Sequence, residues 1–236
     1  NKKVAVIGTG ASAIQFVPAI VPKVKNLTLF QRSAPYVIPK PDRTYSGLEQ
    51  DIYTKWPVLQ QASRAAIYSQ HEVRALAFTV LQVALKPFEW QFKRHLNQSV
   101  KDPVLRAKLT PDYPLGCKRI LISNDYYAAL AQPHVNVVTD SITEVTATGI
   151  TTSDGQQHSV DAIIYGTGFQ ATDFLAPMKI TGRAGQDLNQ VWRDGAEAYL
   201  GMTVSGFPNL FLLYGPNTNL GHNSILYMLE SQFAYI

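Results

Sequence analysis

A glycine-rich turn near the N-terminus is the first place where residue types and spacing could do chemistry. Gly8, Gly10 and Ala13 follow the pattern G-x-G-x-x-A directly after the apolar run 4–7. The first glycine permits a tight turn, the second lets a pyrophosphate approach the backbone, and the small third residue lets helix and strand pack closely. Amides at the start of the following helix would face the phosphates. A glycine-rich turn without a ligand is the alternative. The candidate cofactor-binding residues here are Gly8, Thr9, Gly10, Ala11, Ser12, Ala13 and Gln15.

The residues after the second apolar run, 27–31, bear on which dinucleotide could bind. An NAD enzyme places an acidic residue near this point, where it bonds the ribose diol. This sequence has Arg32 and Ser33 instead. A guanidinium can pair with a 2′-phosphate through parallel hydrogen bonds, and a nearby hydroxyl can add another. The position therefore favours NADPH over NADH, with an ordinary exposed arginine as the alternative.

Ser12 also fits a hydrolase nucleophile elbow, G-x-S-x-A, with His222 as a distant base. An elbow serine normally follows several strands, whereas only the run 4–7 precedes Ser12 in this sequence. We therefore disfavour the hydrolase. The five histidines show no metal-ligand spacing, so we expect no metal site.

The order of apolar runs predicts the elements that would position these residues. A strand at 4–7, a helix at about 11–20 and a strand at 27–31 form a βαβ unit. Three prolines in 34–46 predict an extended surface loop. The stretch 48–108 is helical in pattern, and apolar residues at three- and four-residue spacing between Val73 and Phe88 predict one amphipathic helix that packs on the sheet.

In the C-terminal half, short runs of apolar or alternating residues replace the helical spacing. A helix is expected at 126–130, and Ser153-Asp154-Gly155 is a hairpin signal inside a small antiparallel ribbon that precedes a final buried strand. The expected strands lie at 135–139, 142–146, 150–152, 160–165 and 209–214, and a last helix lies at 224–236. The fold class is therefore α/β: a Rossmann-like dinucleotide-binding domain with a parallel sheet, an inserted helical region and a small antiparallel ribbon.

Composition excludes several classes of protein. The 236 residues are 46% hydrophobic and 16% charged, as in globular proteins. The net charge of +4 is spread along the chain, so we expect no nucleic-acid partner. The longest apolar stretch, 75–85, is too short to span a bilayer, so we expect no membrane association. The single cysteine, Cys117, excludes an intramolecular disulfide and fits a reducing compartment, the cytoplasm.

Several longer stretches resemble class B flavoprotein monooxygenases, in particular the Baeyer–Villiger monooxygenases. These stretches are NKKVAVIGTGASAIQFVPAI, LTLFQRSAPYVIPKPDRTYS, YPLGCKRILISNDYY, DAIIYGTGFQATDF and YLGMTVSGFPNLFLLYGPNTNLGHNSI. The resemblance implies NADP(H) and FAD as cofactors, with O2 and a small ketone that is converted to an ester or lactone through a C4a-peroxyflavin. Oxygenation of nitrogen or sulfur in a heteroatom substrate, a reductase without oxygen chemistry, and an isolated NADPH-binding module remain alternatives.

The same resemblance implies roles for residues outside the glycine turn. Lys118 would help to hold the 2′-phosphate, and Arg119 would lie beside the flavin as the catalytic cation. Thr167 and Gly168 belong to a stretch that resembles an alanine-threonine-glycine motif, with Gly166 in place of the alanine. Asn217 and Ile225 would line the flavin side, and 202–213 would form a strand of the flavin domain.

The resemblance also implies a domain organisation. Residues 1–165 would form the NADPH-binding domain, with the helical insertion at about 48–108, and 166–236 would be a truncated returning segment of the FAD domain. The family's first glycine-rich turn for FAD and its fingerprint motif do not occur in this sequence. We therefore expect a fragment whose partners are FAD and an N-terminal flavin domain of the same protein, and which is inactive alone.

Overall fold

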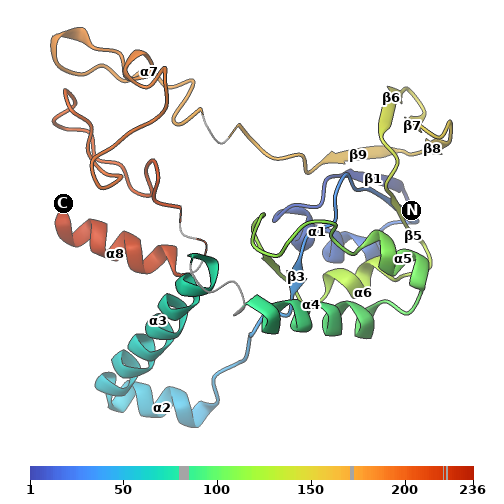
Figure 1. Ribbon diagram of the computed structural model, residues 1–236, viewed down its shortest axis with the longest axis horizontal. Coiled ribbons are helices and arrows are strands. Elements are labelled where there is room, and N and C mark those ends of the chain that lie inside the picture. Colours follow the sequence, from blue (N-terminus) through green and yellow to red (C-terminus); the bar gives the residue numbers. More distant parts are fainter. Residues whose placement is uncertain (80–84, 171–172, 220, 222) are drawn as a thin grey trace. The chain divides into compact units, whose positions relative to one another are not determined.

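The computed structural model describes residues 1–79, 85–170, 173–219, 221 and 223–236, and it divides into two compact units (Figure 1). The first unit comprises Asn1–Tyr45 and Ala77–Gly168, and the second comprises Ser46–Leu76 and Phe169–Ile236. The proposed boundary between an NADPH-binding and a flavin-binding domain at residue 165 stays a prediction.

A four-stranded parallel sheet forms the centre of the first unit. Its strand order is β5-β2-β1-β9. The strands are β1 (Lys3–Ile7), β2 (Asn26–Phe30), β5 (Val135–Val138) and β9 (Ala162–Tyr165). Helix α1 (Ala13–Ile20) and the 3₁₀ turn η1 (Val21–Lys23) connect β1 to β2, so the predicted βαβ unit is confirmed. Val4, Ala5 and Val6 are at most 7% exposed, as expected for a strand covered on both faces.

Helices cover one face of this sheet. Val6 and Leu29 of the sheet share a core with Val17 of α1, Leu96 of α4 and Tyr127 of α6. Helix α4 spans Lys86–Ser99, α5 spans Pro103–Lys108 and α6 spans Tyr126–Leu130, as predicted for 126–130. Because α4 belongs to this core, part of the helical region packs against the sheet.

A three-stranded antiparallel sheet covers the other face (Figure 1). Its strands are β6 (Ile142–Thr146), β7 (Gly149–Thr152) and β8 (Gln157–Ser159). Ile150 packs with Ala5, Phe30 and Val138, which alternate with the residues that face the helices. The predicted ribbon and hairpin are therefore confirmed. The last strand, β9, is half exposed rather than buried, because it pairs only with β1 among the described strands.

The proline-containing segment 34–46 is only partly the surface loop that its prolines predict. Val37 is fully buried and lies in the two-residue strand β3 (Val37–Ile38), which pairs in parallel with β4 (Leu121–Ile122). Val37 belongs to the same core as α4 and β3 contacts this helix, so burial of the Val37 side chain keeps this part of the segment out of solvent. Residues 40–46 are exposed, as expected.

The second unit contains helices and turns. Helix α2 (Gly47–Lys55) starts with a capping box between Ser46 and Glu49. Helix α3 (Pro57–Thr79) lies beside α8 (Ile225–Tyr235), where the Tyr68 and Tyr227 rings are 4.4 Å apart. The helical pattern of 48–108 and the last helix are thus confirmed for the described residues. The expected amphipathic helix between 73 and 88 lies largely outside them, because residues 80–84 and the side chains of 74–79 are not described.

The predicted strands at 209–214 and 202–213 are wrong. Only isolated bridges occur there, from Thr203 to Tyr199 and Phe211. The amide of Leu210 turns back to the Phe207 carbonyl, and Tyr214 has a positive φ, so no ladder continues. A small core forms beside the 3₁₀ turn η3 (Arg183–Gly185) and helix α7 (Leu188–Val191). Its buried members are Leu188, Trp192, Val204, Phe207 and Leu212.

Within the described ranges, no helix has the length and apolar character needed to cross a membrane. The same ranges hold no group of three or more His, Cys, Asp or Glu side chains arranged for a metal ion.

Candidate functional site

The glycine turn begins where the ends of three parallel strands meet. The Gly8 amide donates to the Phe30 carbonyl of β2 at 3.0 Å, and the Gly166 amide after β9 donates to the Ile7 carbonyl at 2.8 Å. Gly8 has φ +109°, and a Cβ there would collide with the carbonyl oxygen of Gly166. The first glycine of the motif is therefore required by this close approach of the backbone.

The second glycine has no such explanation inside the protein. A Cβ on Gly10 would meet no heavy atom within 4 Å. In the described part of the chain, the amides of Gly10, Ala11, Ser12 and Ala13 donate to no backbone carbonyl, and the Ser12 side chain caps no amide. Gln15 turns its side-chain amide back to the Ala11 carbonyl at 2.8 Å. The turn thus presents open space and unpaired donors, which suits phosphate oxygens.

Ser33 connects three segments that are distant in sequence. The Lys118 ammonium donates to Ser33 Oγ at 2.9 Å, across 85 positions of the chain. The Thr9 hydroxyl donates to the Ser33 carbonyl at 3.2 Å. The structure therefore brings the glycine turn, the end of β2 and the Lys118 loop together, and Arg32 is the neighbour of Ser33 in the chain. We call Thr9, Arg32, Ser33 and Lys118 the Ser33 cluster.

Among the described residues, no carboxylate neutralises the positive charge at the Ser33 cluster. Within the residues described, neither Arg32 nor Lys118 has an ion pair, and the exposed Arg119 has neither a hydrogen bond nor an ion pair. Ion pairs elsewhere in the described part of the chain include those from Lys40 to Asp42, from Arg64 to Glu230 and from Arg193 to Asp194. The cluster is therefore electrostatically suited to an anion.

Tyr113 is a neighbour of Lys118 that sequence reasoning missed. The Lys118 ammonium lies 4.3 Å from the centre of the Tyr113 ring. The Tyr113 hydroxyl donates to the Ala34 carbonyl at 2.9 Å, and the Tyr36 hydroxyl donates to the Tyr113 carbonyl at 2.9 Å. Burial raises the pKa of both phenols, so both remain protonated donors. In the sequence, Tyr113 opens the resembling stretch YPLGCKRILISNDYY five residues before Lys118, but no role was predicted for it.

The remaining predicted residues lie apart from the Ser33 cluster in the chain. Thr167 and Gly168 are exposed after β9, at the end of the first unit. Asn217, exposed with φ +61°, and the half-buried Ile225 belong to the second unit. There the buried Gln232 of α8 accepts the Tyr214 amide at 3.1 Å, which anchors the turn before Asn217. His222, the base of the hydrolase alternative, lies outside the described residues.

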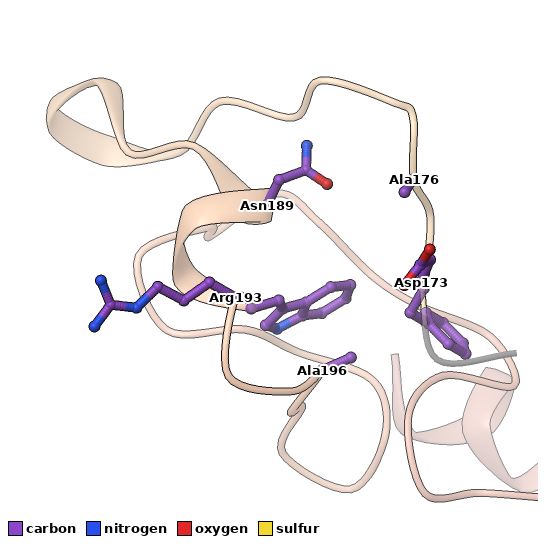
Figure 2. A pocket seen from close by; sticks show the side chains of 7 residues that line it. Asp173, Ala176, Asn189, Arg193 and Ala196 are labelled. Carbon is purple, nitrogen blue, oxygen red and sulfur yellow. The ribbon is translucent and has the colours of Figure 1, made fainter. Parts of the chain in front are cut away.

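A hollow in the second unit contains none of the predicted residues (Figure 2). Its lining is Asp173, Phe174, Ala176, Asn189, Trp192, Arg193 and Ala196. The Asn189 side chain donates to the Met178 carbonyl, and the Trp192 indole donates to the Glu197 carbonyl. Figure 2 shows the Arg193 guanidinium directed away from Asp173, and its Nε donates to Asp194. The polar groups of this hollow do not converge, so the Ser33 cluster is the better candidate site.

The parallel sheet, the βαβ crossover and the glycine turn define a Rossmann-like dinucleotide-binding unit. No family model matches the chain. It is 52% identical to a Baeyer–Villiger monooxygenase of Pseudomonas aeruginosa and 45% identical to one of Streptomyces coelicolor, and both alignments cover 100% of this chain. They cover 45% and 46% of those two proteins, so the chain spans about half the length of the curated relatives it matches.

Solved structures agree with these relatives. A complex of OTEMO with FAD and NADP matches 99% of this chain and 52% of its own, with a TM-score of 0.75 and 27% identity. Cyclohexanone-bound cyclohexanone monooxygenase matches 100% of this chain and 53% of its own, with a TM-score of 0.80 and 25% identity. The resemblance seen in the sequence is therefore confirmed: over its whole length, the chain is homologous to part of the Baeyer–Villiger monooxygenases.

Proposed function

We propose that this chain carries the NADPH-binding region of an FAD-dependent Baeyer–Villiger monooxygenase, in which Arg32, Ser33 and Lys118 hold the 2′-phosphate of the coenzyme. One observation carries the proposal. Lys118 donates to Ser33, which follows Arg32 in the chain, and no carboxylate pairs with either cation in the described structure.

The chemistry of these side chains fits a phosphate dianion. The Arg32 guanidinium offers a planar fork of donors, Lys118 offers a point charge, and Ser33 offers a hydroxyl. An acidic residue at this position would instead repel a 2′-phosphate and bond the ribose diol of NADH. The NADP-bound structural neighbours support the same choice of coenzyme.

The glycine turn would hold the pyrophosphate of the same coenzyme. Gly10 leaves the space that a close phosphate needs, and the unpaired amides from Gly10 to Ala13 would donate to its oxygens. The Thr9 hydroxyl joins this turn to Ser33 by a hydrogen bond, so connected segments would bind the pyrophosphate and the 2′-phosphate of the coenzyme.

The proposed reaction converts a ketone, O2, NADPH and a proton to an ester or lactone, NADP+ and water. When bound, FAD supplies the oxygen chemistry and NADPH supplies the hydride. The part of Arg119 is to place a fixed positive charge where negative charge develops on oxygen. Thr167, Gly168, Asn217 and Ile225 would contribute to the flavin side. FAD would be held together with the part of the protein that the relatives have beyond this chain.

Coenzyme titration tests the binding role. We expect the chain to bind NADPH at least tenfold more tightly than NADH. Arg32→Ala should weaken NADPH binding by about 10- to 100-fold, because a hydrogen bond to a charged group contributes about 1.5–3 kcal/mol. NADH binding should change by less than about twofold.

Arg193→Ala is the matched control, because Arg193 is also exposed but bonds Asp194 in the second unit. It should leave both affinities unchanged. A chain without preference for NADPH, or an Arg32→Ala variant that loses both coenzymes equally, would contradict the proposal.

The catalytic role of Arg119 is tested in the full-length flavoprotein. Arg119→Ala should abolish ester formation while NADPH still reduces the flavin, which stopped-flow absorbance follows separately. Equal loss of both steps would show that Arg119 serves binding or folding instead.

A further inference from the structure

The Tyr113 ring lies beside a cation that is carried on a long side chain. A lysine ammonium ends a flexible four-carbon stem, and ordering that stem costs conformational entropy. Lys118 is exposed, yet its ammonium lies both 4.3 Å from the centre of the Tyr113 ring and 2.9 Å from Ser33 Oγ. The face of an aromatic ring attracts a cation, so the ring favours this one placement.

The ring itself is held at several points. Its hydroxyl donates to the Ala34 carbonyl, and the Tyr113 carbonyl accepts the Tyr36 hydroxyl. The Tyr36 ring packs edge-on against Tyr113 at 5.5 Å and against Phe92 at 4.9 Å. Phe92 is 2% exposed in the core of the first unit. A chain of contacts therefore joins the core to the ammonium of Lys118.

We infer that Tyr113 is a positioning residue for coenzyme selectivity, whose ring holds the Lys118 ammonium beside Ser33 at the place where a 2′-phosphate would bind. This inference rests on the proposed function. It adds a residue that would touch no phosphate and would act through Lys118. Its signature is a loss of discrimination for the 2′-phosphate without a general loss of adenosine binding.

Two probes that differ by a single phosphate isolate this effect. Adenosine 2′,5′-bisphosphate and 5′-AMP are titrated calorimetrically into the 236-residue chain, and their affinity ratio measures recognition of the 2′-phosphate. Tyr113→Leu should lower this ratio about three- to fivefold, the range of an exposed cation–π contact. Tyr113→Phe keeps the ring and should stay within about twofold. If Tyr113→Leu weakens both probes equally, its role is only structural and the inference is overturned.

A double-mutant cycle tests whether Tyr113 acts through Lys118. Lys118→Met should remove most of the preference for the 2′-phosphate, and Tyr113→Leu in that background should lower the ratio no further. Additive losses would contradict the inference. Trp90→Leu is the matched control, because it removes another ring with a cation above it, Arg94 at 5.2 Å, on α4. It should leave the ratio unchanged.

A third variant keeps the shape of the ring in case Tyr113→Leu does not fold. Site-specific incorporation of a trifluorinated phenylalanine at position 113 weakens the attraction of the ring for a cation but preserves its packing. The ratio should fall about threefold relative to Tyr113→Phe, and an unchanged ratio overturns the inference. A wild-type chain without preference for the 2′-phosphate would instead overturn the proposed function itself.

Discussion

The two units of this protein position their side chains by different means. In the first unit, four parallel strands pair in register and are covered by helices on one face and an antiparallel sheet on the other. In the described part of the second unit, isolated bridges, short helices and turns surround a small core. Among the residues that the structure describes, the five non-glycine residues with a positive φ all lie in the second unit, namely Leu175, Ala184, Leu200, Tyr214 and Asn217.

The difference between the units shows that pairing of parallel strands is enough to bring residues of a candidate ligand site together. The strand ends β1, β2 and β9 bring Gly8, Gly166 and the Ser33 cluster to one edge, because the carboxyl ends of parallel strands meet there. In the second unit a residue such as Asn217 depends on local turns and on single contacts, such as the hydrogen bond that the Tyr214 amide donates to the Gln232 side chain. We therefore expect the first unit to tolerate fewer core and backbone changes.

The largest expected difference between the units concerns their cores. Leu29 is fully buried in the sheet core, whereas Leu212, 7% exposed, belongs to the small second core. Leu29→Ala should lower the free energy of unfolding of the first unit by about 4 kcal/mol, and Leu212→Ala should cost the second unit about 2 kcal/mol. Hydrogen exchange resolved by unit is the measurement. If either variant lowered the protection of backbone amides equally in both units, the two cores would not be independent and the comparison would fail.

The next effect separates backbone packing from ligand binding inside one turn. Gly8→Ala should destabilise the chain by about 3 kcal/mol in urea unfolding, since Gly8 has a positive φ and its Cβ would meet the Gly166 carbonyl. Gly10→Ala should change stability by less than about 0.5 kcal/mol. It should nevertheless weaken NADP+ binding at least tenfold, if the open space at Gly10 serves the pyrophosphate. A stable Gly8→Ala variant, or a Gly10→Ala variant with unchanged binding, would contradict this division of roles.

The smallest expected effect is a pH dependence in the first unit. Burial lowers the pKa of His95, and the weaker influence of the Ser123 carbonyl, 3.0 Å from Nε2, acts in the opposite direction. Because the folded-state pKa lies below that of the unfolded chain, protonation favours unfolding. Stability should therefore be constant above about pH 6.5 and fall as the pH drops through the folded pKa. His95→Gln should flatten this fall in urea midpoints measured from pH 7.5 to 5.0, and an unchanged slope would show that other groups cause it.

The sequence predicted the first unit well because its signals are local and periodic. The apolar run before Gly8, the glycine spacing and the Ser153-Asp154-Gly155 turn each determine a nearby backbone shape. The burial of Val37 was not predictable in the same way, because it depends on α4 and β4, which are distant in sequence. The prolines around Val37 indicated only an extended chain.

The second unit was predicted less well for the same physical reason. The run 209–214 has the composition of a buried strand, but a strand needs a paired neighbour, and Phe211 finds only an isolated bridge. No pattern indicated that α3 lies beside α8, where Asn223 donates to Glu72 across 151 positions. The residues of the candidate site differ in the same way. Arg32 and Ser33 were predicted from their position after a strand, and Lys118 was predicted from the family resemblance. The contact of the Tyr113 ring with Lys118 was found only in the structure.

The bond from Lys118 to Ser33 has a consequence for how the protein survives heat and proteases. Because the groups proposed to bind the 2′-phosphate come from segments 85 positions apart, an unfolded chain cannot assemble them, and a coenzyme held by them would bind only after folding. At a concentration one hundred times its dissociation constant, such a ligand stabilises the native state by about 2.7 kcal/mol. Cellular coenzyme supply would thereby help to determine the lifetime of this polypeptide.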